Sequence, residues 1–343
     1  MDQQIRLFLQ QRDLNFAKKG IASGLIAGTA WGLDGVLMGM VLALAPLTNN
    51  MSLFAVPVVG ACLHDGFAAL WLFIHNVING KWRDYARTLK TKPAKMIMLA
   101  AVLGGPIGSS GNLLGIYFAG ASYTAAITAA YPAIGAILGF VFLKEKIAPR
   151  VWAGILLAVL GSFIVGFTPP EGANYPHFYL GLGFAAVAAI GWALEGVIST
   201  HGMDLVDSDI AIGIREATSF LVYIFVIIPL CGKTAYQMLF ASLNSSPGLF
   251  IAVIGMIGAI SVLSWYRAMN MTGVSRAMGL NVTYALWSVF FSWLLNHLQI
   301  TPNLIFGVVI ISIGTILTIG NPKDLVNLRN DKEAHYESDA CKI

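Results

Sequence analysis

Long uncharged runs of apolar residues constrain the fold of this chain more than any other feature of its sequence. A helix of about 20 such residues crosses the ~30 Å hydrocarbon core of a bilayer. Within lipid, backbone groups must find their hydrogen-bond partners inside a helix or a closed barrel. Barrel strands are about half as long as these runs and alternate in polarity. The runs therefore predict an all-α membrane protein.

The composition excludes a water-soluble globule. Of the 343 residues, 57% are hydrophobic and 11% are charged, whereas roughly a quarter of the residues of a soluble domain are charged. The mean hydropathy of +0.73 leaves too little polar surface to face water. The expected surroundings are a lipid bilayer, and the net charge of +4 gives no reason to expect a nucleic-acid partner.

Apolar runs separated by Pro, Gly, Asn and charged residues predict ten transmembrane helices. Residues 1–20 contain no apolar stretch that ends in a small-residue cleavage site, so we expect the first helix to be an uncleaved signal anchor. We assign residues 1–20 and 321–343 to cytoplasmic tails, and residues 21–168 and 178–320 to two five-helix repeats. The predicted spans are 21–44, 53–77, 96–118, 121–143, 151–168, 178–200, 209–231, 247–270, 274–297 and 303–320.

Lys and Arg residues lie almost entirely on one side of these spans. If the N-terminus is inside, the outer segments carry only Lys233. Because cytoplasmic loops are enriched in Lys and Arg, we expect both termini in the cytoplasm and the protein in the inner membrane of a bacterium. One inner loop departs from this pattern, since it contains Asp204, Asp207 and Asp209 but neither Lys nor Arg.

The two halves of the chain resemble each other. The segment Trp-Gly-Leu-Asp-Gly-Val (31–36) matches Trp-Ala-Leu-Glu-Gly-Val (192–197). Because five helices per half is an odd number, the second repeat must be inverted in the membrane, which is the architecture of secondary transporters with a substrate site between the halves. A shift of 153 residues adds the pairs Gly120 with Gly273, Ser122 with Ser275, Tyr131 with Tyr284, Ile147 with Ile300, Pro149 with Pro302, Gly154 with Gly307 and Gly161 with Gly314.

Two short stretches of the first repeat resemble the EamA branch of the drug/metabolite transporter superfamily. They are Tyr131-Pro132-Ala133 and Phe142-Leu143-Lys144-Glu145-Lys146-Ile147. Members of that family have ten helices in two inverted five-helix repeats, and the resemblance implies this fold for residues 21–320.

A larger set of residues resembles bacterial choline permeases of the LicB type, which implies a carrier for choline or a related amine. Two positions depart from the resemblance. Asp34 occupies the position of a glycine in those permeases, and Glu216 occupies the position of a glutamine. The expected substrate cavity therefore contains up to two additional acids. The matching residues are His64-Asp65, Gly105-Pro106-Ile107-Gly108, Asn112, Ala130-Tyr131-Pro132-Ala133-Ile134, Trp192, Glu195, Ile214-Arg215, Ala217-Thr218-Ser219-Phe220, Gly279-Leu280-Asn281-Val282, Tyr284 and Trp287.

Two tryptophan–acid pairs have the chemistry of a cation site. Asp34 follows Trp31, and Glu195 follows Trp192, by three residues, so each ring shares a helix face with a carboxylate. Aromatic faces attract a quaternary ammonium by about 0.5–2 kcal/mol per contact, and the acid supplies net charge. Both tryptophans lie too deep in their spans for the interfacial belt. The alternative for Asp34 is a charge pair within the protein.

A second aromatic group, Tyr266, Tyr284 and Trp287, lies in the second repeat. Tyr284 and Trp287 share a helix face with Asn281. Aromatic residues at helical spacing favour packing when taken alone, and it is the resemblance to choline permeases that assigns Tyr284 and Trp287 to the substrate site. Asn112 and Asn281 would either bond a neighbouring helix or reach a substrate hydroxyl.

Adjacent charged residues, His64-Asp65 and Arg215-Glu216, occupy corresponding places in the second helix of each repeat. An ionisable residue inside a span is a functional candidate by default. One interpretation is a proton relay that includes Asp34, since a buried carboxylate can take up and release a proton. The other is a structural pair whose charges cancel. We expect such a pair for Arg215, and both interpretations stay open for Asp65.

The sequence contains no P-loop, no metal-ligand cluster and no Ser, His and Asp or Cys and His set at a catalytic spacing. We therefore expect neither an enzyme nor a cofactor, and ATP-driven transport by this chain alone is excluded. Its three cysteines, Cys62, Cys231 and Cys341, form no disulfide framework.

The predicted function is import of choline or a related small quaternary or cationic amine by alternating access, with proton coupling open. The membrane potential alone would drive a cation inward. The alternative within the superfamily is export of amino acids, metabolites or drugs. Alternatives of another class are a polytopic membrane enzyme and a non-transporting receptor. A homodimer is a possible assembly.

Overall fold

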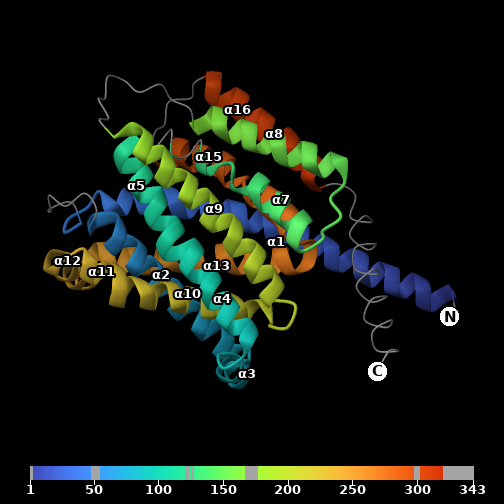
Figure 1. Cartoon of the computed structure of the whole chain (residues 1–343), viewed down its shortest axis with the longest axis horizontal. Coiled ribbons are helices and arrows are strands. Elements are labelled where there is room, and N and C mark those ends of the chain that lie inside the picture. Colours follow the sequence, from blue (N-terminus) through green and yellow to red (C-terminus); the bar gives the residue numbers. More distant parts are fainter. Residues whose placement is uncertain are drawn as a thin grey trace.

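The computed structural model describes residues 3–47, 55–119, 124, 127–166, 177–296 and 302–319, and every regular element in these residues is a helix (Figure 1). The first half contains α1 (Gln3–Leu42), α2 (Ala55–Ile78), α3 (Trp82–Thr88), α4 (Lys92–Val102), the π-helical η1 (Leu103–Ser109), α5 (Ser110–Ala119), α7 (Tyr131–Phe142) and α8 (Pro149–Gly166). The second half contains α9 (Phe178–Gly202), α10 (Ser208–Val222), the π-helical η2 (Tyr223–Ile227), α11 (Ile228–Leu230), α12 (Lys233–Leu243), α13 (Ser246–Thr272), α14 (Val274–Asn281), α15 (Tyr284–Asn296) and α16 (Pro302–Ile319).

The helices coincide with the predicted spans, which confirms an all-α membrane protein. Eight stretches of the described residues are long and apolar enough to cross a membrane, and α7 and most of α8 are shorter apolar helices. Each of these stretches falls on one of the ten predicted spans. Part of the span predicted at 121–143, and all of the tail predicted at 321–343, lie outside the described residues.

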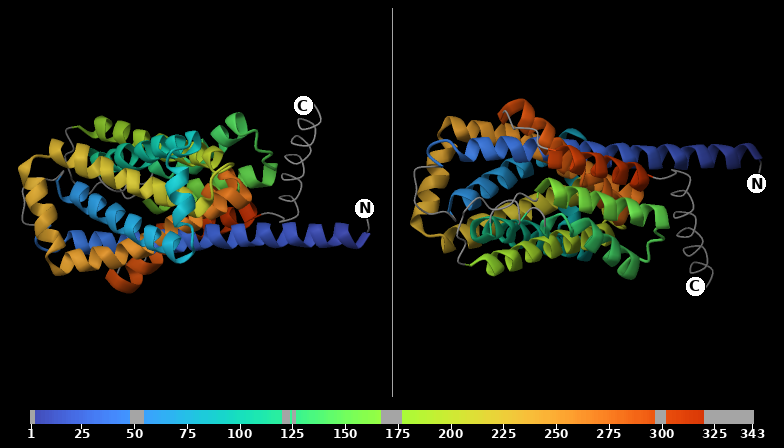
Figure 2. Two further views of the ribbon diagram at one scale, coloured as in Figure 1. Left: turned by 90° about the horizontal axis from the view of Figure 1, so that it is seen from below. Right: turned by 90° about the horizontal axis from the view of Figure 1, so that it is seen from above.

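The predicted N-terminal tail continues into the first span as one helix. α1 is 40 residues long, which corresponds to about 60 Å at 1.5 Å per residue. Only Leu14–Leu42 is apolar enough to span, and the N-terminal part extends beyond the other helices (Figure 2). The first span thus begins several residues earlier than residue 21, because the helix does not stop at the end of the polar segment.

The contacts between helices repeat when the two halves are exchanged. α1 packs against α13, α14 and α15, and its counterpart α9 packs against α4, η1, α5 and α7. α2 packs against α10, α7 against α14, and α8 against α16, so that each meets its own counterpart (Figure 1). The halves therefore interlock instead of forming separate bundles.

Glycines that correspond in the two halves bring α8 and α16 into backbone contact. A Cβ on Gly154 would lie 2.6 Å from the carbonyl oxygen of Gly314, and one on Gly161 would lie 2.8 Å from that of Gly307. Only glycine permits such an approach, which is the small-residue packing of membrane helices. Gly154 corresponds to Gly307 in the repeat, and Gly161 corresponds to Gly314. The contact of Gly154 with Gly314 is therefore the repeat counterpart of the contact of Gly161 with Gly307.

A stripe of glycines gives α1 the same close packing on the second half. The four glycines recur at every fourth residue, so they lie on one face of the helix. A Cβ on any of them would come within 3.0 Å of an atom of Met271, Thr272 or a residue of the stretch 280–288. They are Gly20, Gly24, Gly28 and Gly32.

Short helices join the long ones at opposite ends of the bundle. The C-terminal part of α2 meets the start of α10, where the amide of Asn76 donates to the carbonyl oxygen of Asp209 at 3.0 Å. α3 follows α2 at this end, whereas α12 follows the other end of the α10–α11 segment. We refer to these as the α3 end and the α12 end.

The outer surface of the described residues is rich in large apolar side chains. Phe140, Phe225, Leu249 and Ile316 are all more than half exposed. Several charged residues, among them Glu195 and Glu216, are by contrast buried. Apolar surface outside and charge inside fits a lipid solvent, and the buried charges identify the region to examine for function.

Candidate functional site

Charged side chains gather in the interior of the helix bundle. Glu195 on α9 and Glu216 on α10 are each 1% exposed, and Arg215 on α10 is 9% exposed. Asp34 on α1 and His64 on α2 are also buried. A buried charge is costly unless it is paired and hydrogen-bonded, so the partners of these residues define the site.

Arg215 holds the two glutamates together. Its Nε donates to Oε1 of Glu195 at 2.5 Å, and its Nη2 donates to Oε2 of Glu195 at 3.2 Å. Its Nη1 donates to Oε1 of Glu216 at 2.7 Å. A guanidinium fork on a carboxylate fixes orientation as well as distance. Arg215 therefore pairs with Glu195, which we predicted as a substrate-binding residue, and with Glu216, which we predicted as a possible coupling residue.

The π-helical turn η1 lies against this ion pair. A Cβ on Gly104 would overlap the carboxylate of Glu195, and one on Gly105 would overlap the hydroxyl of Ser219. Pro106 lies within η1 and lacks a backbone N–H, and π-helical turns are frequent at functional sites. The absence of side chains at Gly104 and Gly105 is what lets η1 approach Glu195 and Ser219.

Tyr266 on α13 joins the glutamate from the other side. Its hydroxyl donates to Oε1 of Glu195 at 3.4 Å and lies 2.9 Å from Oγ of Ser199. The ring of Trp265 packs edge-on against Tyr266 with 5.7 Å between centroids. This places a predicted aromatic residue, Tyr266, next to the predicted acid.

Aromatic rings border the acids on the side of α7. Trp192 packs edge-on against Tyr131 with 6.1 Å between ring centroids. The amide of Asn281 donates to the hydroxyl of Tyr131 at 3.0 Å. A Cβ on Gly108 would lie 3.0 Å from the indole of Trp192, so η1 also packs on this ring. Tyr131 was not among the predicted site residues, although it belongs to the repeat.

A second acid group lies between α1 and α2. Nε2 of His64 is 3.0 Å from Oδ1 of Asp34, and its Nδ1 is 3.1 Å from Oδ1 of Asp65. The other carboxylate oxygen of Asp65 accepts a hydrogen bond from Ser219 at 2.6 Å and lies 4.0 Å from Nη1 of Arg215. These contacts link Asp34 through to Glu195 as one polar network.

Several buried polar atoms of this region have no hydrogen-bond partner among the described residues. They include Oε2 of Glu216, Oδ1 of Asn281 and Nε1 of Trp265. Two of the three are acceptors and one is a donor.

The other predicted site residues are located by what they pack against. Trp31 and Tyr284 pack on the same apolar core as Trp192. Trp287 stacks on Phe291 with 6.1 Å between ring centroids, within an aromatic group on α15. Asn112 is partly buried on α5, which packs against α9.

A separate ionic network lies at the α3 end. Lys81 donates to both carboxylate oxygens of Asp207, at 2.8 and 2.9 Å, and to Asp209 at 2.9 Å. Arg267 on α13 donates to both oxygens of Asp209 at 2.7 Å. Partial burial lowers the pKa of Lys81, but its hydrogen bonds to Asp207 and Asp209 raise it above the ordinary value. Two acids of the discordant loop, Asp207 and Asp209, thus find their cations on other segments.

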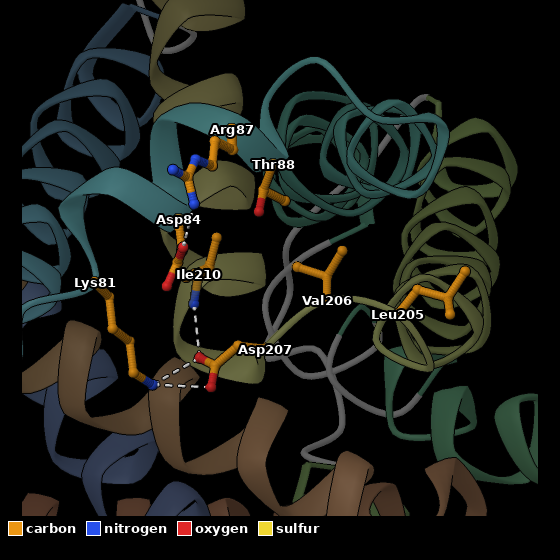
Figure 3. Close-up of a pocket in the computed structure, with 8 residues that line it drawn as sticks. All are labelled: Lys81, Asp84, Arg87, Thr88, Leu205, Val206, Asp207 and Ile210. Atoms are coloured by element: carbon orange, nitrogen blue, oxygen red, sulfur yellow. Dashed lines mark hydrogen bonds and ion pairs between the residues drawn. The ribbon is translucent and has the colours of Figure 1, made fainter.

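A shallow pocket of about 370 Å³ lies beside this network. Figure 3 shows Lys81 reaching Asp207 at its edge, with the backbone N–H of Ile210 donating to the same carboxylate. The pocket contains no aromatic ring, unlike the interior site. Its lining residues are Lys81, Asp84, Arg87, Thr88, Leu205, Val206, Asp207 and Ile210.

The fold and the interior site define a polytopic α-helical membrane protein with a charged, aromatic-bordered centre. The EamA-like transporter family model matches residues 18–167 and again residues 179–320, and the chain belongs to this family. The chain is 26% identical over 317 residues to "Protein LicB" of Haemophilus influenzae (strain ATCC 51907 / DSM 11121 / KW20 / Rd), covering 88% of this chain and 97% of that protein. A crystal structure of a protein that is 16% identical in sequence has a similar fold. Its TM-score is 0.69, and the match covers 88% of this chain and 96% of the other.

Proposed function

We propose that this protein is a secondary transporter that imports choline or a related small quaternary or cationic amine across the inner membrane of a bacterium. The observation that carries the proposal is the excess of carboxylates over cations in the interior network. Four carboxylates, those of Asp34, Asp65, Glu195 and Glu216, share the interior with Arg215 and His64. The network stays net negative even when His64 is protonated, so a cation would lower its electrostatic energy.

Aromatic rings beside the acids support a methylated cation over a metal ion. Trp192 lies three residues before Glu195 on α9, and Tyr266 donates to the same glutamate. Ring faces attract a quaternary ammonium by about 0.5–2 kcal/mol per contact, and such a cation gives up its water readily. The sequence resemblance to choline permeases favours choline among these cations.

The exchange of halves in the helix packing supports alternating access. The contacts Gly154–Gly314 and Gly161–Gly307 are related by exchange of corresponding glycines. We propose ten spans in two inverted repeats, with both termini in the cytoplasm and the solute between the halves. An inside-negative potential of 100 mV contributes about 2.3 kcal/mol per charge to the import of a cation.

Proton coupling is part of the proposal, and Asp34, His64, Asp65 and Glu216 would carry it. Both ring nitrogens of His64 face a carboxylate oxygen, but a neutral imidazole has only one N–H. With His64 neutral and both Asp34 and Asp65 ionised, only one of the two contacts is a hydrogen bond. When the three side chains together take up one more proton, both contacts become hydrogen bonds. The charged groups that face it are Arg215 and Glu216 on α10.

The experiment is thermal unfolding of the purified protein with a panel of amines and amino acids. Choline at 100 times its dissociation constant should stabilise the protein by about 2.7 kcal/mol. If aromatic amino acids shift the transition and choline does not, the substrate is wrong. Labelled choline in proteoliposomes of defined orientation then tests direction, because efflux without uptake would favour the exporter.

A further inference from the structure

The ionic network at the α3 end connects the two halves of the chain. Lys81 lies in the turn between α2 and α3, in the first half. Its partners Asp207 and Asp209 lie at the start of α10, and Arg267 lies on α13, both in the second half. Asp209 is the centre of the network, since it binds both cations and its side chain is only 7% exposed.

The network acts on the end of a helix that carries the interior site. Asp207 caps α10 by accepting hydrogen bonds from the N–H groups of Asp209 and Ile210 at 2.9 and 3.3 Å. Arg215 lies six residues beyond Asp209 on the same helix, which is about 9 Å along its axis. Any movement of the start of α10 away from α2 would therefore also move Arg215.

The two polar networks differ in how easily they can open. The side chains of Lys81, Asp207 and Arg267 are 28%, 46% and 36% exposed, so water reaches both cations, although Asp209 between them is buried. Partly exposed ion pairs contribute little net stability. Separating the buried pair of Arg215 and Glu195 would leave uncompensated charges in the interior. The network that can part reversibly is the one at the α3 end.

The α12 end is closed by apolar side chains, whereas the α3 end combines the ionic network with apolar residues such as Tyr85 and Ile210. The cluster of side chains at the α12 end is apolar and comes from α2, η2, α11, α12 and α13, together with the segment that follows α1. Apolar contacts hold surfaces together without fixing one geometry, whereas charge pairs fix register and partner. Its most deeply buried members include Leu47, Val59, Tyr223, Ile228 and Ile251.

We propose that Lys81, Asp207, Asp209 and Arg267 form a charge latch that holds the α3 end shut and parts in each transport cycle. The proposal rests on transport by alternating access, the function proposed above. When the latch opens, α2 and α3 separate from α10 and α13, and the interior site becomes accessible from the α3 end. When it is formed, the site is closed on that side.

The test is the reactivity of a cysteine introduced beneath the latch. Val206 is 7% exposed and lines the pocket beside Lys81, so Val206→Cys, with Cys62, Cys231 and Cys341 replaced by serine, reports opening. A membrane-impermeant maleimide should label this cysteine slowly in the purified full chain. Lys81→Gln and Arg267→Gln, which act from opposite halves, should each raise the labelling rate several-fold. Lys81→Arg should keep the rate low.

The matched control is Arg87→Gln. Arg87 lines the same pocket, but its side chain is 80% exposed and pairs with Asp84 of its own helix. Labelling that stays slow in both Lys81→Gln and Arg267→Gln, with the thermal transition unchanged, would overturn the latch. The labelling assay needs no solute. If the latch variants are labelled faster but the protein does not bind choline, the proposed substrate is wrong and the latch is still supported.

Discussion

Arg215 on α10 and Glu195 on α9 form a two-bonded ion pair in the interior of the helix bundle, with nitrogen–oxygen distances of 2.5 and 3.2 Å. The side chain of Glu195 is 1% exposed and that of Arg215 is 11% exposed. In such a place, removal of Arg215 leaves the charge of Glu195 buried without a cation, whereas removal of Glu195 leaves Arg215 paired with Glu216. The consequences for stability and for binding can be separated by experiment.

Arg215→Gln should destabilise the protein more than any surface substitution. Loss of one member of a buried pair costs about 3–5 kcal/mol, because the remaining charge keeps its desolvation penalty. The double variant Glu195→Gln with Arg215→Gln should recover much of that loss. Thermal unfolding in detergent measures both. Additive losses in the double variant would mean that the two residues do not interact.

Glu195→Gln should abolish choline binding while the protein stays folded, because Arg215 keeps its hydrogen bond to Glu216. The amide keeps the shape of the side chain but removes the negative charge that attracts the cation. Isothermal titration and the thermal shift with choline measure the change. Asp84→Asn on α3, where the carboxylate is 67% exposed, is the control and should bind choline as the wild type does. Retained affinity in Glu195→Gln would remove this carboxylate from the site.

Gly104→Ala should disturb the site without changing any charge. The added methyl group would overlap the carboxylate of Glu195, and overpacking of this kind costs about 1–3 kcal/mol. Both the transition temperature and the affinity for choline should fall. Gly183→Ala on α9 is the matched control, because a Cβ there meets nothing within 4 Å. Equal effects of the two substitutions would refute a specific role for Gly104.

Much of the fold could be predicted from the sequence because hydropathy and helix length are local properties. The apolar runs located ten stretches that the helices occupy. The polar segment 1–20 was predicted as a cytoplasmic tail, and what the sequence did not indicate is that residues 3–20 form one helix with the first span. Hydropathy reports where a helix enters lipid, and a helix can continue beyond that point.

The site was harder to predict because helical spacing shows which residues share a face but not which neighbour that face meets. Trp192 and Tyr266, both predicted as site residues, lie beside the charged network. Trp287, also predicted as a site residue, stacks on Phe291 of its own helix. The contact of Gly104 with Glu195 depends on how η1 crosses α9, and nothing local in either segment indicates it.

Charge counting by loop missed the partners of the acidic loop for the same reason. Asp207 and Asp209 stand in a segment without Lys or Arg, yet Lys81 lies 126 residues away from Asp207 in sequence and 2.8 Å away in space. The sequence did contain an indication, because acids in a loop without Lys or Arg are expected to pair with cations from neighbouring segments. Which segments supply them depends on the packing of α2 against α10.

Asp34→Asn should weaken the response of transport to a pH gradient. In this variant Nε2 of His64 faces an amide instead of a carboxylate. Protonation of His64 then adds no second hydrogen bond to a charged partner, and only the contact with Asp65 still favours it. In proteoliposomes at zero membrane potential, an inward proton gradient should speed choline uptake by the wild type and have a smaller effect on the variant. Uptake driven by the potential alone should persist in both. An unchanged response to the gradient in Asp34→Asn would show that the coupling proton binds elsewhere, and Glu216→Gln would then be the next variant to compare.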